Sequence, residues 1–123
     1  LYSSAASDVY KRQTFYFEAK EMDEHGWVVG FGDLKKLEKY LLDMYDHSMI
    51  IAEDDPELAT FQELHKNGLC DLRVVPEASL ESSAKAALNK ANEILLEMTK
   101  DRARCFKVEA RENDKNSAIY TLE

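Results

Sequence analysis

A chain of 123 residues and 14.1 kDa is long enough for one small domain with its own core, and assembly with further copies would add stability. With 16 basic against 24 acidic residues the formal net charge is −8, which argues against nucleic acid or an anionic membrane as a partner. Cys70 and Cys105 lack C-x-x-C spacing, and the sequence shows neither a secretion signal nor a span of about 20 apolar residues, so we expect a cytoplasmic location.

The first thirteen residues, LYSSAASDVYKRQ, show no sustained helical or strand period, which is typical of a disordered arm. The chain also opens on Leu1 rather than on methionine. The amino-acid sequence of this segment resembles the adapter-derived tails found at the ends of environmental sequencing reads. We therefore expect residues 1–13 to be a non-native tail and residues 14–123 to form a single domain.

The first predicted element of that domain is a half-buried strand from Thr14 to Lys20, because apolar and polar residues alternate along TFYFEAK. DEHG then predicts a turn, and the apolar run WVVGF either pairs back or leads into a helix. Asp33 is a suitable N-cap for that helix, whose apolar stripe extends to about Tyr45.

Two more helices are predicted in the middle of the chain. Asp55 followed by proline favours a short helix over residues 56–67, which Gly68 would end in a left-handed turn. LRVV predicts a brief extended segment. Ser79 can then cap a long helix that continues to about residue 98.

The C-terminal part predicts a hairpin, formed by RCFKVEARE, a turn at NDKN, and SAIYTL. Phe106, Val108 and Ala110 are expected on one face, and the period of two places Glu112 at the end of that same face. A carboxylate in that position must be solvated, paired, or directed at a ligand.

Together these elements predict an α+β fold with an antiparallel sheet and helices packed on one face. The strand at residues 14–20 needs a neighbour, which we expect to come from an N-terminal segment that this chain lacks.

Two motifs could carry chemistry. Asp46 and His47 could form a relay in which the carboxylate orients the imidazole, or they could simply end a helix, where a histidine cation favours the dipole. Glu112 could accept two parallel hydrogen bonds from a flat amidine-like edge, as in a guanine or pterin ring, or could form a surface ion pair with Lys115 or Arg111.

Metal and thiol chemistry have weaker support in the sequence. His25, His47 and His65 fall in separate elements, so a zinc site made from them alone is not expected. Cys70 could be a nucleophile, but no partner lies beside it in sequence, and such a cysteine is more often a small core residue.

Four segments, DEHGWVVGFGDLKK, YDH, PEASLESSA and VEARENDKNSAIY, stand in an order that resembles the 6-pyruvoyl-tetrahydropterin synthase and 6-carboxy-tetrahydropterin synthase family, of the tunnelling fold, over Thr14 to Glu123. The resemblance implies a homo-oligomer, a trimer or a hexamer of two stacked trimers, whose strands join into a barrel with active sites between subunits. It implies chemistry on the pterin substrate 7,8-dihydroneopterin triphosphate, in which a zinc ion held by three histidines acidifies the substrate's side chain.

In the same family a cysteine moves protons with the support of an Asp-His pair. Asp46 and His47 match that catalytic pair, and Glu112 matches the glutamate that anchors the pterin ring. Ser79 and Glu81 fall where the family has a Thr-x-Glu element near the pterin, so all three are expected substrate-binding residues.

The departures from the family pattern concern the metal. The family's zinc histidines and catalytic cysteine precede the strand that begins here at Thr14, and residues 1–13 contain neither residue type. Gly30 stands where an aspartate is common, and Leu80 and Ser83 depart from the usual helix opening. We therefore expect no zinc at the family site of this chain and no turnover.

The favoured interpretation is an N-terminally truncated 6-carboxy-tetrahydropterin synthase-like lyase, of the kind that serves queuosine-type deazapurine synthesis. The alternatives are a 6-pyruvoyl-tetrahydropterin synthase and a non-catalytic pterin-binding or assembly module.

Overall fold

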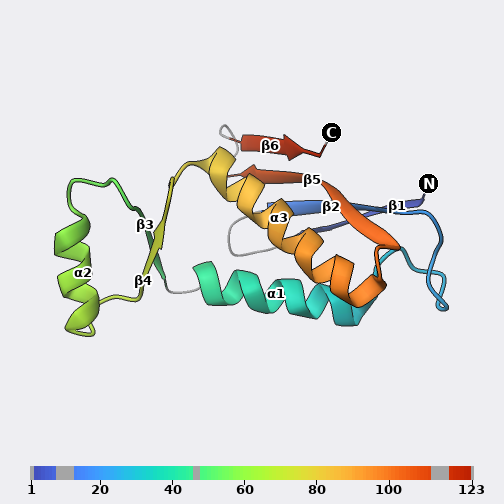
Figure 1. The fold of residues 1–123 in the computed structure, drawn as a ribbon, viewed down its shortest axis with the longest axis horizontal. Helices are drawn as coiled ribbons and strands as arrows, with labels where there is room; N and C mark the ends of the chain where they lie inside the picture. Colours follow the sequence, from blue (N-terminus) through green and yellow to red (C-terminus); the bar gives the residue numbers. More distant parts are fainter. Residues whose placement is uncertain (1, 8–12, 46–47, 112–116, 123) are drawn as a thin grey trace.

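The computed structural model describes residues 2–7, 13–45, 48–111 and 117–122 (Figure 1). In chain order the elements are β1 (Tyr2–Ser7), β2 (Gln13–Ala19), α1 (Phe31–Tyr45), β3 (Met49–Ala52), α2 (Leu58–Lys66), β4 (Leu72–Val75), α3 (Leu80–Thr99), β5 (Ala103–Arg111) and β6 (Ser117–Thr121).

The main sheet has the strand order β1-β2-β5-β6, and each neighbouring pair is antiparallel. α1 and α3 lie on one face of this sheet (Figure 1). The predicted α+β class with helices on one face of an antiparallel sheet is therefore confirmed for the main sheet. The core lies between this face and the two helices.

β2 supplies the centre of that core because its side chains alternate between buried and half-buried along its whole length. Phe15 and Phe17 point inward with their rings stacked at a centroid distance of 6.4 Å. α3 faces them with buried Ala84, Ala87 and Leu88. Two alanines at this contact allow the helix to approach the sheet closely, which explains why the long helix is attached there.

The expectation that residues 1–13 contain no regular structure is wrong for Tyr2–Ser7. This segment forms β1, which pairs with β2 from Tyr2 opposite Ala19 to Ser7 opposite Thr14. The expectation that the neighbour of β2 would come from a segment this chain lacks is therefore also wrong. β2 itself begins at Gln13, one residue earlier than predicted. The physical reason is that the outer edge of β2 offers unpaired backbone groups, and an extended segment of small residues can satisfy them whatever its side-chain pattern. The non-native origin of residues 1–13 stays a prediction.

The predicted common face of Phe106, Val108 and Ala110 is wrong at Phe106. The partner of Tyr16 is Lys107 but the partner of Phe17 is Cys105, so Phe106 is an extra residue, a β-bulge in β5. Cys105 and Val108 on either side of the bulge are buried, whereas Phe106 is half-buried, with its ring 6.4 Å from that of Tyr16. A strict period of two therefore fails for one residue and resumes at Val108.

The predicted helices are present with small shifts at their ends. α1 begins at Phe31, and Asp33 lies in its first turn, where the carboxylate accepts a hydrogen bond from the Gly30 N–H at 3.1 Å. Gly68 follows α2 with φ +75°, as expected. The Ser79 hydroxyl accepts from the Ser82 N–H at 3.0 Å and caps α3.

A strand at residues 49–52 was not predicted, and it pairs in parallel with β4 to form a separate two-stranded sheet. α2 connects these two strands and lies away from the main sheet (Figure 1). None of the described side chains of α2 is buried. The prediction that this helix also covers the main sheet is therefore wrong, because its apolar stripe is too short to bury against more than the small β3–β4 sheet.

Cys105, fully buried in β5, gives the core a measurable pH dependence. Burial raises the pKa of its thiol from 9.0 to about 11, so the folded state holds this proton when the unfolded state has lost it. The linkage relation makes the free energy of unfolding fall as pH rises from 9.0 to about 11, by about 2 to 3 kcal/mol. Urea unfolding across this range should show the decline, and Cys105→Ala should reduce it. A Cys70→Ala control should keep it; equal slopes in both variants would contradict the assignment.

Candidate functional site

One end of the main sheet collects the termini of several elements. α1 ends, α3 and β6 begin, and β5 ends there (Figure 1). Lys90 Nζ of α3 lies 5.6 Å from the ring centre of Tyr40 in α1, and the two helices run in opposite directions (Figure 1). Asn92 of α3 bonds the backbone of Cys105, so β5 returns along α3 toward the helix N-terminus. We call this the site end of the sheet.

The predicted catalytic and binding residues adjoin these termini in the sequence. Asp46 and His47 directly follow α1, and Glu112 directly follows β5; all three lie outside the described residues. Ser79 and Glu81 are described, at the start of α3. Their assignment as site residues stays a prediction.

Ser79 and Glu81 both have local roles at the helix start. The Ser79 hydroxyl caps α3 and also bonds Ser82 Oγ at 2.9 Å. Glu81 is exposed in the first turn, where a carboxylate is favoured by the helix dipole. The backbone that carries both is therefore fixed by capping, which is what a binding element at a helix N-terminus requires.

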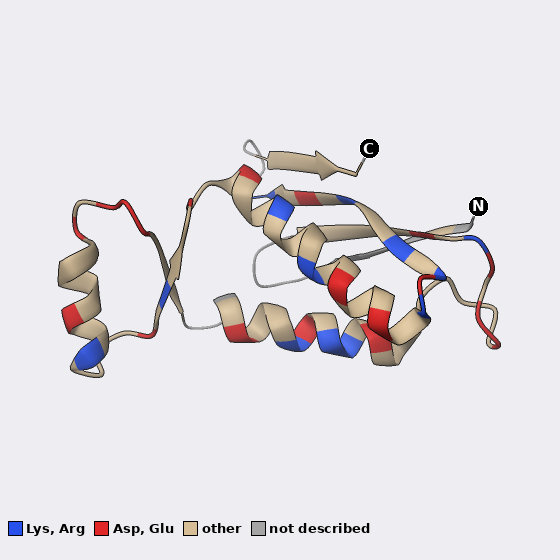
Figure 2. Ribbon diagram, in the orientation of Figure 1, with Lys and Arg blue, Asp and Glu red and all other residues tan. Residues whose placement is uncertain are grey.

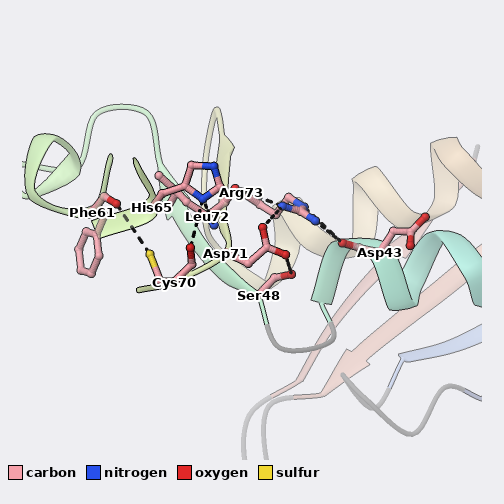
Figure 3. Close-up of polar contacts among 8 residues, drawn as sticks. All are labelled: Asp43, Ser48, Phe61, His65, Cys70, Asp71, Leu72 and Arg73. Atoms are coloured by element: carbon pink, nitrogen blue, oxygen red, sulfur yellow. Dashed lines mark hydrogen bonds and ion pairs between the residues drawn. The ribbon is translucent and has the colours of Figure 1, made fainter. Parts of the chain in front are cut away.

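An arginine that sequence reasoning missed holds the end of α1 (Figure 3). Arg73 of β4 donates to the Asp43 carbonyl from Nε at 3.2 Å and from Nη2 at 3.0 Å. Its Nη1 pairs with Asp71 Oδ1 at 2.6 Å. The other oxygen of Asp71 accepts from the Ser48 hydroxyl at 3.4 Å. A guanidinium at a helix C-terminus satisfies a free carbonyl and suits the negative end of the dipole.

This network fixes the chain on both sides of Asp46 and His47. Asp43 precedes the pair and Ser48 follows it, and the Arg73 and Asp71 side chains hold both. The sequence signal was a charged residue inside the apolar run LRVV, which a solvent-facing strand position also explains. Only the placement of β4 beside the end of α1 separates the two explanations.

Replacing Arg73 with methionine should therefore loosen the end of α1. Methionine keeps an unbranched stem but removes the bonds to the Asp43 carbonyl and to Asp71, and the half-exposed site limits the loss to about 1 to 2 kcal/mol. Hydrogen exchange should be faster in the last turn of α1. The control is Arg104→Met, whose exposed side chain pairs with Glu18 on the main sheet. Equal stability and equal exchange of the two variants would contradict this role.

His65 and Cys70 lie in the small β3–α2–β4 region rather than at the site end (Figure 3). The Nδ1 atom of His65 is 3.2 Å from both the Leu72 N–H and the Cys70 carbonyl oxygen. One nitrogen cannot accept from the first and donate to the second at once, so the tautomer selects one bond. The Cys70 thiol donates to the Phe61 carbonyl at 3.8 Å, so the imidazole faces the backbone of Cys70 and not its sulfur.

Gln13 is a buried polar residue at the site end that sequence reasoning left out. Its side chain is only 1 % exposed, and among the described residues Oε1 has no hydrogen-bond partner. Its backbone pairs with Ala110 near the end of β5. Leaving a buried amide oxygen without a hydrogen-bond partner lowers the stability of the folded state by about 1 to 3 kcal/mol.

The family resemblance implies zinc, and the described residues do not provide its ligands. His25 is exposed in the turn before α1, beside Glu24 at 3.6 Å, and His65 is occupied with backbone groups. No group of three His, Cys, Asp or Glu side chains with metal-binding geometry occurs in residues 2–7, 13–45, 48–111 and 117–122. Because zinc requires three or four such ligands, these residues do not fit it.

Solved structures share this fold. An uncharacterised protein from Wolinella succinogenes matches with a TM-score of 0.75 at 20% identity, covering 90% of this chain and 76% of that one. A 6-pyruvoyl tetrahydropterin synthase from Plasmodium vivax matches with a TM-score of 0.59 at 17% identity, over 89% and 76% of the two chains. The 6-pyruvoyl tetrahydropterin synthase of Plasmodium falciparum matches with a TM-score of 0.55 at 17% identity, covering 94% of this chain and 85% of that one. No curated protein matches the chain.

The fold is therefore that of the tunnelling-fold proteins, α+β with helices on one face of an antiparallel sheet. A family model described as 6-pyruvoyl tetrahydropterin synthase matches residues 11–123, and the chain belongs to this family of pterin lyases. Among the described helices, none is both long and apolar enough to cross a membrane.

Proposed function

We propose that this chain is a 6-carboxy-tetrahydropterin synthase-like member of the family, related to lyases that act on 7,8-dihydroneopterin triphosphate in queuosine-type deazapurine synthesis, and that this chain itself does not turn the substrate over. The observation that carries the proposal is the convergence at the site end. The segments with Asp46-His47, Ser79-Glu81 and Glu112 each adjoin an element that terminates there. A pterin bound at that end would meet an acid–base pair, a capped helix start and a carboxylate.

Each group has a role that its chemistry allows. Glu112, ionised, accepts two parallel hydrogen bonds from the ring N–H and amino groups of the pterin. His47, oriented by Asp46, has the chemistry to move a proton on a substrate side chain in a zinc-loaded member of the family. Arg73 and Asp71 act as positioning residues, because they hold the chain on both sides of this pair.

Glu112→Gln should weaken pterin binding about tenfold or more, because one charged acceptor becomes a neutral amide that cannot accept both hydrogen bonds. Calorimetric titration with neopterin would measure it. The control is Glu109→Gln on the same strand, where the carboxylate pairs with Arg111 at 2.7 Å. Unchanged affinity in Glu112→Gln, or an equal loss in both variants, would refute the anchor assignment.

A non-catalytic pterin-binding or assembly module is the second candidate, and the lack of a three-ligand group among the described residues favours it. We propose that this chain takes up no zinc at the family site and does not turn over substrate. Metal analysis of the purified protein and a product assay test this together. About one zinc per subunit with synthase activity would overturn it.

We also propose that the protein works as a homo-oligomer, a trimer or a hexamer, in the cytoplasm. The support is physical: in the described part of the main sheet, β1 and β6 are edge strands, and edges of this kind join between subunits or aggregate. Ile119 on β6 is an exposed apolar residue at such an edge. Sedimentation analysis measures the subunit number.

A further inference from the structure

The region from residue 48 to residue 79, which we call the β3–α2–β4 unit, leaves apolar surface uncovered. Leu69 is 73% exposed, Val74 44% and Met49 38%, and the helix of the unit buries no side chain. A two-stranded sheet is marginally stable by itself and gains stability from a further strand or a covering element.

One edge of this small sheet is already covered. The N–H of Leu72 in β4 points outward and lies 3.2 Å from His65 Nδ1, which accepts it in one tautomer of the imidazole. The Leu72 carbonyl accepts from Arg73 Nη1 at 3.3 Å. His65 and Arg73 therefore lie against the outward backbone groups of Leu72, and a strand added to β4 would have to displace them.

The other edge, on β3, faces no described strand, although the Ala52 carbonyl already accepts from the Asp55 N–H at 3.0 Å. Met49 donates to the Asp71 carbonyl at 2.7 Å and Glu53 to that of Val75 at 2.8 Å. In a parallel ladder alternate residues face the partner strand, so the N–H groups of Ile50 and Ala52 point away from β4. Among the described residues no strand other than β4 pairs with β3.

The unit is also strongly acidic. It holds seven acidic and two basic residues, which accounts for −5 of the formal net charge of −8. Figure 2 shows the acidic residues along the β3–α2 connection, on α2 and beside β4. The acidic residues are Glu53, Asp54, Asp55, Glu57, Glu63, Asp71 and Glu77. A second copy would bring two such units together against like-charge repulsion, whereas a basic partner would gain attraction.

We propose that the edge of β3 that faces away from β4 binds an extended, basic segment of a partner protein by strand addition. The backbone of the segment bonds the N–H and carbonyl of Ile50 and the N–H of Ala52. Its apolar side chains cover the exposed residues of the unit, and its Lys or Arg side chains face the acidic residues that follow β3, which are Glu53, Asp54 and Asp55. This interaction requires no pterin chemistry.

The probe is a peptide of about seven residues with alternating lysine and valine, added to the full chain. It should slow hydrogen exchange at the Ile50 and Ala52 amides by about tenfold or more at low salt, and the effect should shrink as salt screens the charges. A peptide with glutamate in place of lysine should have no such effect. Equal protection by both peptides would overturn the charge assignment.

The matched variants are Ile50→Pro and Ile50→Val. Proline removes an outward N–H that the β3–β4 ladder does not use, so it should abolish peptide protection at Ala52 while valine keeps it. Ala52→Lys is the second variant in case proline prevents folding; its added positive charge should weaken binding about tenfold. Equal binding by the variants would overturn the proposal. So would peptide-free dimerisation that Ile50→Pro removes, since the occupant would then be a second copy.

Discussion

Leu88→Ala should lower the free energy of unfolding by about 3 to 5 kcal/mol, as measured by urea denaturation. Leu88 is 0% exposed and belongs to the core cluster with Phe15, Phe17 and Val108. Truncation removes buried apolar surface and leaves a cavity between α3 and the sheet. The main sheet and the helix cannot close it easily, because the alanines of α3 already bring them near contact.

The control for this prediction lies two turns further along the same helix. Leu96→Ala makes the same chemical change at a side chain that is 59% exposed, so it should cost less than about 1 kcal/mol. A similar loss in both variants would mean that α3 does not face the sheet with Leu88.

Asn92→Leu should lower the free energy of unfolding by about 2 to 5 kcal/mol, also measured by urea denaturation, because it leaves two buried backbone groups without hydrogen-bond partners. The Asn92 amide donates to the Cys105 carbonyl at 2.9 Å and accepts from the Cys105 N–H at 2.7 Å. β6 pairs with β5 only from Lys107 onward, so at Cys105 the edge of β5 that faces β6 has no strand beside it. Asn92 supplies both missing bonds from the helix.

Asn89→Leu is the matched control for Asn92, three residues earlier on α3 and exposed. It should leave the stability within about 0.5 kcal/mol of the parent. If the two variants are equally stable, the side-chain bonds to Cys105 contribute nothing measurable and the prediction fails.

Sequence patterns that extend over a few residues predicted the elements that depend only on neighbouring residues. Alternation predicted β2, the apolar stripes predicted the helices, and Ser79 and Gly68 mark helix ends as expected. These features depend on propensity, period and capping, all of which operate within a few residues.

Features that depend on distant segments were missed. β3 needs a parallel partner more than 20 residues away, and MIIA alone carries no alternation. β1 is a strand because β2 presents an edge, not because YSSAAS has a strand pattern. In the same way, Arg73 acquires its role only because β4 lies beside the end of α1.

The residues of the candidate site also fall into two groups, those that a sequence motif pointed to and those that only the packing of distant segments shows. Motif order pointed to the family, and the family match confirms that prediction. It also pointed to Asp46, His47 and Glu112, which lie outside the described residues, so their roles stay predictions. Asp71 and Arg73 were not predicted, because positioning residues bind the backbone and carry no motif of their own.

The bulge at Phe106 acts as a phase shift within one strand. Before it, odd-numbered residues such as Ala103 and Cys105 face the helices; after it, the even-numbered Val108 and Ala110 do. A one-residue deletion there would remove the bulge and leave a regular alternation, in which Lys107 follows Cys105 as an outward residue and Val108 still faces the helices. Relatives should therefore tolerate loss of the residue at position 106 without changing which side chains of β5 face the core, and a one-residue gap between Cys105 and Val108 is structurally allowed in alignments of this family.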